Sequence, residues 1–69
     1  MSENVYKLIE IIGTSNESME KAVQNAIVKA GETVKNMQWF EVTETRGRIS
    51  SNLSVTWQVT IKVGFSVAE

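Results

Sequence analysis

Residues 55–67 read VTWQVTIKVGFSV, a stretch in which apolar and polar side chains alternate along the chain. The apolar set begins with Val55 and Trp57, and the polar set begins with Thr56 and Gln58. A period of two places the two sets on opposite faces of a β-strand. The stretch therefore predicts a long strand with one face on a hydrophobic core.

A second stretch of the same period begins at Trp39, and three turn-forming residues, Ser50, Ser51 and Asn52, separate it from the first. Asn tolerates the positive φ angles that tight hairpin turns require. We predict a hairpin with a two-residue turn at Ser51 and Asn52.

The register of this hairpin follows from matching its apolar faces, because a slip of one residue would expose the whole apolar set. The predicted inner partners are Phe40 with Val63, Val42 with Ile61, and Glu44 with Val59. The predicted outer partners are Trp39 with Gly64, Glu41 with Lys62 as an ion pair, and Thr43 with Thr60. We therefore expect Phe40 in the core and Trp39 outside it, where Gly64 leaves room for the indole.

The distal half of the hairpin interrupts the inner apolar pattern. In this register Glu44, Arg46 and Arg48 turn inward. Arg46 then lies opposite Trp57 as a possible cation–π neighbour, and Gln58 lies opposite Thr45. Two interpretations stay open: an arm that projects past the helix toward another chain, and a frayed, twisted hairpin tip.

Residues 5–12 read VYKLIEII and predict a first strand that ends at Gly13, with apolar side chains on both faces. From Met19 to Val34, apolar residues recur three and four positions apart and predict one helix of about five turns.

The start of this helix is ambiguous in the sequence. Thr14 has the spacing of a capping box with Glu17, and Ser15 is an equally suitable N-cap. Either residue satisfies the backbone N–H groups at the helix start.

The order strand, helix, strand, strand predicts an α+β two-layer unit. Its three-stranded antiparallel sheet packs on one long helix, and a right-handed crossover brings the last strand beside the first. The chain has no proline, internal repeat or linker-like segment, so we expect a single domain over residues 1–69.

Chain length predicts self-association. At 69 residues, folding buries only about 60% of the surface that the unfolded chain exposes. Small domains compensate with disulfides, a structural metal or association, and this chain contains no Cys and no His. Association is the remaining route, and no metal site is expected.

Charge and hydropathy limit the classes of partner that this chain can bind. Seven basic and eight acidic residues leave a formal charge of −1, without a basic run that could follow a phosphate backbone. No apolar stretch approaches the roughly 20 residues of a membrane span, and the first four residues, Met1-Ser2-Glu3-Asn4, have neither the basic flank nor the apolar core of a secretion signal. We expect a cytoplasmic protein that binds neither nucleic acid nor membrane.

The same composition argues against an enzyme. Without His or Cys, the commonest nucleophilic and metal-assisted mechanisms are excluded, and no pair of acidic residues has a spacing that suggests acid–base work. The unusual residue is Trp39, a large aromatic on a polar face. Its pattern fits either burial at a subunit contact or stacking on a planar ligand.

Several of these segments resemble those of bacterial dodecins, and the likeness runs from Val5 to Val67. The segments are Val5-Tyr6-Lys7 with Gly13-Thr14-Ser15, Trp39-Phe40-Glu41-Val42 with Arg46-Gly47, Trp57-Gln58-Val59, and Lys62-Val63-Gly64-Phe65. The resemblance implies a hollow homododecamer that binds flavins in pairs, each ring stacked against a tryptophan near a twofold axis.

The resemblance also assigns residues to the flavin site. Trp39 matches the stacking tryptophan, Gln58 matches the glutamine that hydrogen-bonds the polar edge of the ring, and Arg46 matches an arginine at the ligand site. A neutral amide suits a ring edge that presents both donors and acceptors.

The implied function is storage and buffering of FMN, with riboflavin and FAD as alternative ligands, and quenching of the flavin by electron transfer from the indole. The alternative function is a structural oligomeric shell with little or no flavin binding. Ser66 stands where many bacterial relatives have arginine, which weakens any inference of coenzyme A binding.

Overall fold

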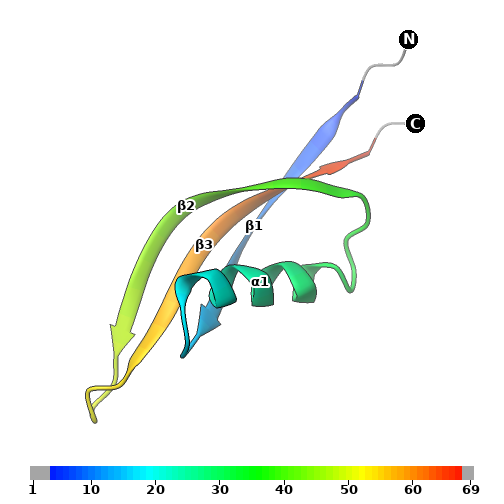
Figure 1. Cartoon of the computed structure of the whole chain (residues 1–69). Helices are drawn as coiled ribbons and strands as arrows, with labels where there is room; N and C mark the ends of the chain where they lie inside the picture. The colour runs from blue at the N-terminus through cyan, green and yellow to red at the C-terminus, as the bar shows by residue number, and fades with distance from the viewer. Residues whose placement is uncertain (1–3, 68–69) are drawn as a thin grey trace.

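The computed structural model describes residues 4–67 and confirms the predicted order of strand, helix, strand, strand (Figure 1). The elements are β1 (Tyr6–Ser15), α1 (Met19–Ala30), β2 (Met37–Ile49) and β3 (Val55–Ser66). The strands form one antiparallel sheet in the order β1-β3-β2, so the last strand lies beside the first, as predicted. Within the described residues α1, at 12 residues, is too short to cross a membrane.

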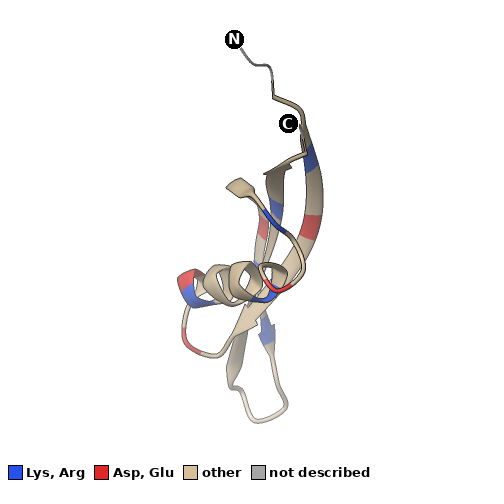
Figure 2. Cartoon of the chain, turned by 90° about the vertical axis from the view of Figure 1, so that its right-hand side faces the viewer, with Lys and Arg blue, Asp and Glu red and all other residues tan. Residues whose placement is uncertain are grey.

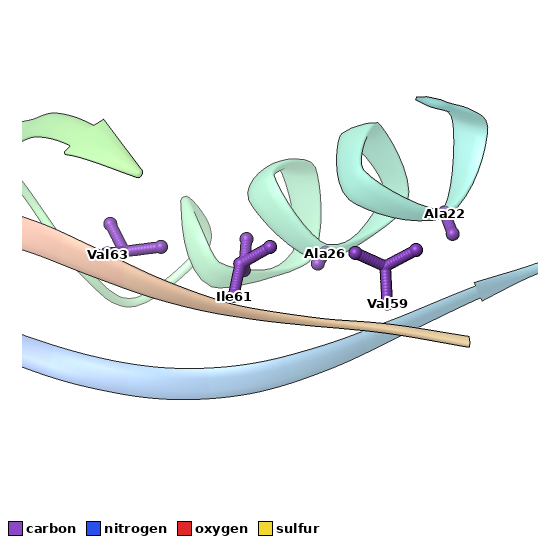
Figure 3. Close-up of a cluster of buried hydrophobic side chains, with 5 residues drawn as sticks. All are labelled: Ala22, Ala26, Val59, Ile61 and Val63. Carbon is purple, nitrogen blue, oxygen red and sulfur yellow. The ribbon is translucent and has the colours of Figure 1, made fainter. Parts of the chain in front are cut away.

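The core lies between α1 and the central strand. Its buried side chains, which Figure 3 shows between helix and sheet, are Ala22, Ala26, Val59, Ile61 and Val63. The alanines allow the helix to approach the sheet closely, and a Cβ atom at Gly13 would overlap the carbonyl oxygen of Ala22. Gly13 is therefore needed inside β1, and the prediction that it ends this strand was wrong.

The helix begins later than predicted because β1 continues through Ser15. Ser18 is the N-cap, and its Oγ accepts a hydrogen bond from the N–H of Lys21 at 3.0 Å. The Oγ of Ser15 instead accepts from the N–H of Glu17, at 2.9 Å, in the turn before the helix. Neither predicted N-cap, Thr14 or Ser15, has that role.

The helix also ends earlier than the apolar spacing predicted. It stops at Ala30, after which the N–H groups of Glu32 and Thr33 bond to carbonyl groups three residues back. This tighter turn breaks the α-helical pattern. Asn36 then adopts a φ of 64°, and the chain enters β2.

The outer face of β1, opposite α1, is not covered by any other element within residues 4–67. Ile9 and Ile11 pack against the core, whereas Leu8 and Ile12 are 57% and 56% exposed. The helix therefore covers only one of the two apolar faces of this strand.

The predicted register of the hairpin is correct near the start of β2 and wrong beyond Val42. The confirmed pairs are Trp39 with Gly64, Phe40 with Val63, Glu41 with Lys62, and Val42 with Ile61. The register then shifts by one residue, so that Glu44 pairs with Thr60 and Thr45 with Val59. Thr43 is the extra residue of this β-bulge, and its Oγ1 donates to the carbonyl oxygen of Thr60 at 3.3 Å.

The bulge reverses the faces of the distal half of β2. Arg46 pairs with Gln58, not with Trp57, and Arg48 pairs with Thr56. Directly opposite residues in an antiparallel pair share a face, so both arginines lie on the outer, polar face. The predicted inward turn of Glu44, Arg46 and Arg48 was therefore wrong, as was the cation–π pairing with Trp57.

The hairpin loop is longer than the predicted two-residue turn. It closes through the N–H of Ser50, which donates to the carbonyl oxygen of Ser54 at 2.9 Å. Positive φ falls on Leu53, at 69°, and not on Asn52. The side chain of Asn52 instead accepts from the N–H of Ser54 at 3.1 Å.

The helix covers β1 and β3 but leaves the inner face of β2 largely open. Phe40 is 49% exposed and Val42 is 44% exposed. The prediction that Phe40 lies in the core is therefore wrong for the single chain, because no part of α1 reaches over it.

Candidate functional site

The three residues that the resemblance assigns to a site all lie on the outer face of the sheet. Trp39 and Arg46 come from β2, and Gln58 comes from β3. Their common face follows from the pairing of Trp39 with Gly64 and of Arg46 with Gln58, because Gly64 and Gln58 are in phase along β3.

The indole of Trp39 lies across the central strand. A Cβ atom at Gly64 would overlap the indole ring, so the predicted space for this side chain is present. On the far side of Gly64, the ring of Tyr6 meets the indole edge-to-face, with centroids 4.9 Å apart and planes at 71°. Trp39 nevertheless stays 44% exposed, and this exposed aromatic surface can accept a flat ligand.

Arg46 and Gln58 form a second, polar group. The Nε of Arg46 donates to the Oε1 of Gln58 at 2.9 Å across the β2–β3 ladder. This bond orients the amide, and within residues 4–67 the amide nitrogen of Gln58 has no hydrogen-bond partner of its own. The pair can therefore offer N–H donors to a polar ring edge.

The structure does not bring Trp39 together with this polar pair. Trp39 lies opposite Gly64, which is six residues along β3 from Gln58, and six residues of strand span roughly 20 Å. The predicted partner of Gln58 was wrong by one residue, but the predicted separation holds. One chain supplies the two halves of a site at two distant places.

Charges are interspersed along the elements, as Figure 2 shows. Glu41 and Lys62 are opposite each other but do not form the predicted ion pair; the salt bridge found within residues 4–67 joins Lys29 and Glu32 at 3.3 Å. The described residues contain no group of three His, Cys, Asp or Glu residues that could hold a metal ion.

A groove on the opposite face of the sheet was not foreseen from the sequence. It has a volume of about 620 Å³, lies between α1 and β2, and is lined mainly by apolar side chains. Phe40 and Val42 contribute its sheet side, and Val23 and Ile27 contribute its helix side. The alternation pattern identified the apolar face but could not show that the helix would leave part of it open.

Sequence reasoning also missed Tyr6 as a neighbour of Trp39. Its ring comes from β1, and its contact with Trp39 depends on the order of the strands. The available signal was a large aromatic residue in phase with other outward-facing positions of the first strand.

Comparison with known proteins identifies close relatives. A family model described as Dodecin matches residues 5–68. The dodecin of Thermus thermophilus is 43% identical over 65 residues, covering 94% of each chain. The solved dodecin from Streptomyces davaonensis matches with a TM-score of 0.91 at 43% identity, covering 99% of this chain and 100% of that one.

A further relative carries a different ligand in its name. The calcium dodecin of Mycobacterium tuberculosis is 33% identical over 64 residues, covering 93% of this chain and 90% of that protein. Its solved structure matches with a TM-score of 0.85 and is described as having a novel calcium-binding site.

Proposed function

The chain belongs to the dodecin family, and we propose that it stores flavin, sequestering FMN as stacked pairs and quenching its excited state. Members of this family bind flavins and are generally non-catalytic binders of small molecules. Riboflavin and FAD share the isoalloxazine ring of FMN and are the alternative ligands.

The observation that carries the proposal is the position of Trp39. A tryptophan that is 44% exposed on a polar face contributes little to the core, yet Gly64 makes room for it. Stacking on an aromatic side chain contributes about 1–3 kcal/mol per base in single-stranded nucleic acids. The flat isoalloxazine ring is expected to gain stabilisation of the same order on the indole.

The site requires more than one copy of the chain. The structural match to solved dodecins implies a dodecamer. Because Trp39 and Gln58 are roughly 20 Å apart along the sheet, a single ring that touches both takes them from different subunits. Each site is then an interface, and a tryptophan outside the core gains its role only in the assembly.

In such a site each residue has a separate task. The indole of Trp39 stacks on the ring and donates an electron to the excited flavin, which returns to the ground state by back transfer without emission. Gln58, oriented by Arg46, donates to an acceptor atom at the polar edge of the ring. No residue is required to move a proton, so binding is a reversible equilibrium.

The alternative is a structural shell in which Trp39 only seals a subunit contact. It is favoured by the exposed apolar side chains on both faces of the sheet, such as Leu8, Ile12 and Phe40. Calcium is a further alternative ligand, raised by the name of the M. tuberculosis relative.

Titration with FMN separates these possibilities. We expect the assembled protein to quench FMN fluorescence stoichiometrically, and Trp39→Ala to lose most of the binding while the assembly stays intact by sedimentation. Trp57→Phe is the matched control, because Trp57 lies on the inner face opposite Gly47. Intact wild-type assemblies that fail to quench FMN would contradict flavin storage, and a parallel calorimetric titration with Ca²⁺ tests the other ligand.

Mixed assemblies test whether subunits share the site. Chains with Trp39→Ala and chains with Gln58→Ala are each expected to bind weakly when assembled alone. Co-assembled, they should regain a fraction of intact sites in a flavin titration. Absence of recovery in verified mixed assemblies would place both contacts on one chain.

A further inference from the structure

Tyr6 and Trp39 are in contact although their strands are not neighbours. β3 lies between β1 and β2, and the two rings meet above it with centroids 4.9 Å apart. The two rings can meet because the residue of β3 that lies beneath the indole, Gly64, has no side chain. Three strands therefore contribute to the placement of one indole.

Within residues 4–67 the ring of Tyr6 forms one aromatic pair, with Trp39. It lies on the outer face, away from α1, and is 42% exposed, so it adds little to the core. Within residues 4–67 its hydroxyl group forms no hydrogen bond. Its edge-to-face pairing with Trp39 is a geometry that favours one relative orientation of two aromatic rings.

We infer that Tyr6 is a positioning residue, which holds the indole of Trp39 in the orientation that stacks on a flavin ring. This inference rests on the proposed function and adds a residue to its site. Gly64 restrains the indole from below, and Tyr6 restrains it from the side. An exposed side chain without the second restraint samples several rotamers, and ordering it on binding lowers affinity.

Replacement of Tyr6 should therefore affect both the binding of FMN and the quenching of its fluorescence. Loss of the aromatic edge is expected to weaken FMN binding roughly three- to tenfold, the range that follows from ordering one side chain. Electron transfer depends on close stacking, so the bound flavin should also become more fluorescent. A residue that only stabilised the fold would change neither property in the intact assembly.

The experiment uses Trp57→Phe as the background, so that Trp39 is the one remaining tryptophan. Into it we introduce Tyr6→Ile, Tyr6→Phe or Ile12→Ala. The phenylalanine keeps the aromatic edge, and Ile12 is an exposed residue on the same face of β1, six residues from Tyr6. Time-resolved fluorescence anisotropy of the ligand-free assembly reports the order of the indole, and FMN titration reports affinity and residual emission.

We expect Tyr6→Ile to increase indole motion, weaken FMN binding and raise bound-state emission, with Tyr6→Phe and Ile12→Ala close to the background. Unchanged anisotropy in Tyr6→Ile would overturn the inference, and this readout needs no flavin. Dissociation of the Tyr6→Ile assembly would also overturn it, by assigning the ring to a subunit contact. Failure of the background protein itself to bind FMN would contradict the proposed function instead.

Discussion

The sheet beneath α1 and the rest of the sheet differ in what covers them. Val59, Ile61 and Val63 of β3 are almost completely buried against the helix. The β2–β3 hairpin extends past the end of α1 (Figure 1). The inner face of β2 and this hairpin carry apolar side chains that stay exposed. The same alternating pattern thus produces a core in one region and an open apolar surface in the other.

This difference shows which part of the sheet a single small chain cannot cover. The described residues extend over 56 × 21 × 14 Å, an elongated shape in which one short helix covers only part of the sheet. Large exposed apolar patches on a protein surface mark interaction sites. The covered region therefore forms the core of the single chain, and we expect the open region to contact neighbouring copies.

The largest effect is expected in the covered region. Ile61→Ala removes a completely buried side chain from the centre of the core, and such substitutions cost about 2–5 kcal/mol. Chemical denaturation of the assembled protein at fixed chain concentration measures this loss. A cost below about 1 kcal/mol would show that the core is not centred on Ile61.

Phe40→Ala should act on the open region instead. In the single chain this ring is 49% exposed beside the groove, so its removal is expected to weaken assembly more than local folding. We expect dissociation at a chain concentration at least about tenfold higher than for the wild type, which corresponds to about 1.4 kcal/mol. Sedimentation across a concentration series tests this, and unchanged assembly would remove Phe40 from the subunit contacts.

A smaller effect is expected at the start of the helix. Ser18→Ala removes the N-cap hydrogen bond to Lys21 and should cost about 1 kcal/mol. Thr14→Ala is the matched control, because Thr14 is a hydroxyl residue that does not cap the helix. Thermal unfolding compares the stability of the two variants. An equal loss of stability in both would contradict the assignment of Ser18 as the N-cap.

The smallest effect is expected at the hairpin loop. Leu53 has a φ of 69° and is 80% exposed, and left-handed backbone costs non-glycine residues roughly 1–2 kcal/mol, with Asn among the more tolerant. Leu53→Asn should therefore raise the free energy of unfolding by less than about 1 kcal/mol without changing assembly. Weaker assembly of this variant would instead mean that the loop contacts another subunit.

Much of the fold could be predicted because each pattern had one consistent solution. Thirteen alternating residues at 55–67 and a spaced apolar stripe from Met19 allow one assignment each. The apolar positions Phe40 and Val42 also aligned the first part of the hairpin correctly, including the placement of Trp39 over Gly64. Local periodicity was sufficient there because both faces carried distinct residue types.

The bulge at Thr43 could not be predicted for the opposite reason. From Thr43 to Arg46 every side chain is polar, so the alternation carries no information about which residue faces inward. An extra residue in such a stretch leaves no trace in the pattern, although it turns Arg46 toward Gln58. The N-cap was ambiguous in the same way, because several hydroxyl residues precede the helix.

The sequence by itself determined the elements, their order, the buried face of β3 and the outward position of Trp39, since these depend on residues close together in the chain. Tertiary structure alone decided the pairing of Arg46 with Gln58, the open groove beside Phe40 and the contact of Tyr6 with Trp39. Each of these depends on how separate strands align or on how far the helix extends. Strand alignment and helix extent are set by the packing of the whole chain. The periodicity of a single segment carries no information about that packing.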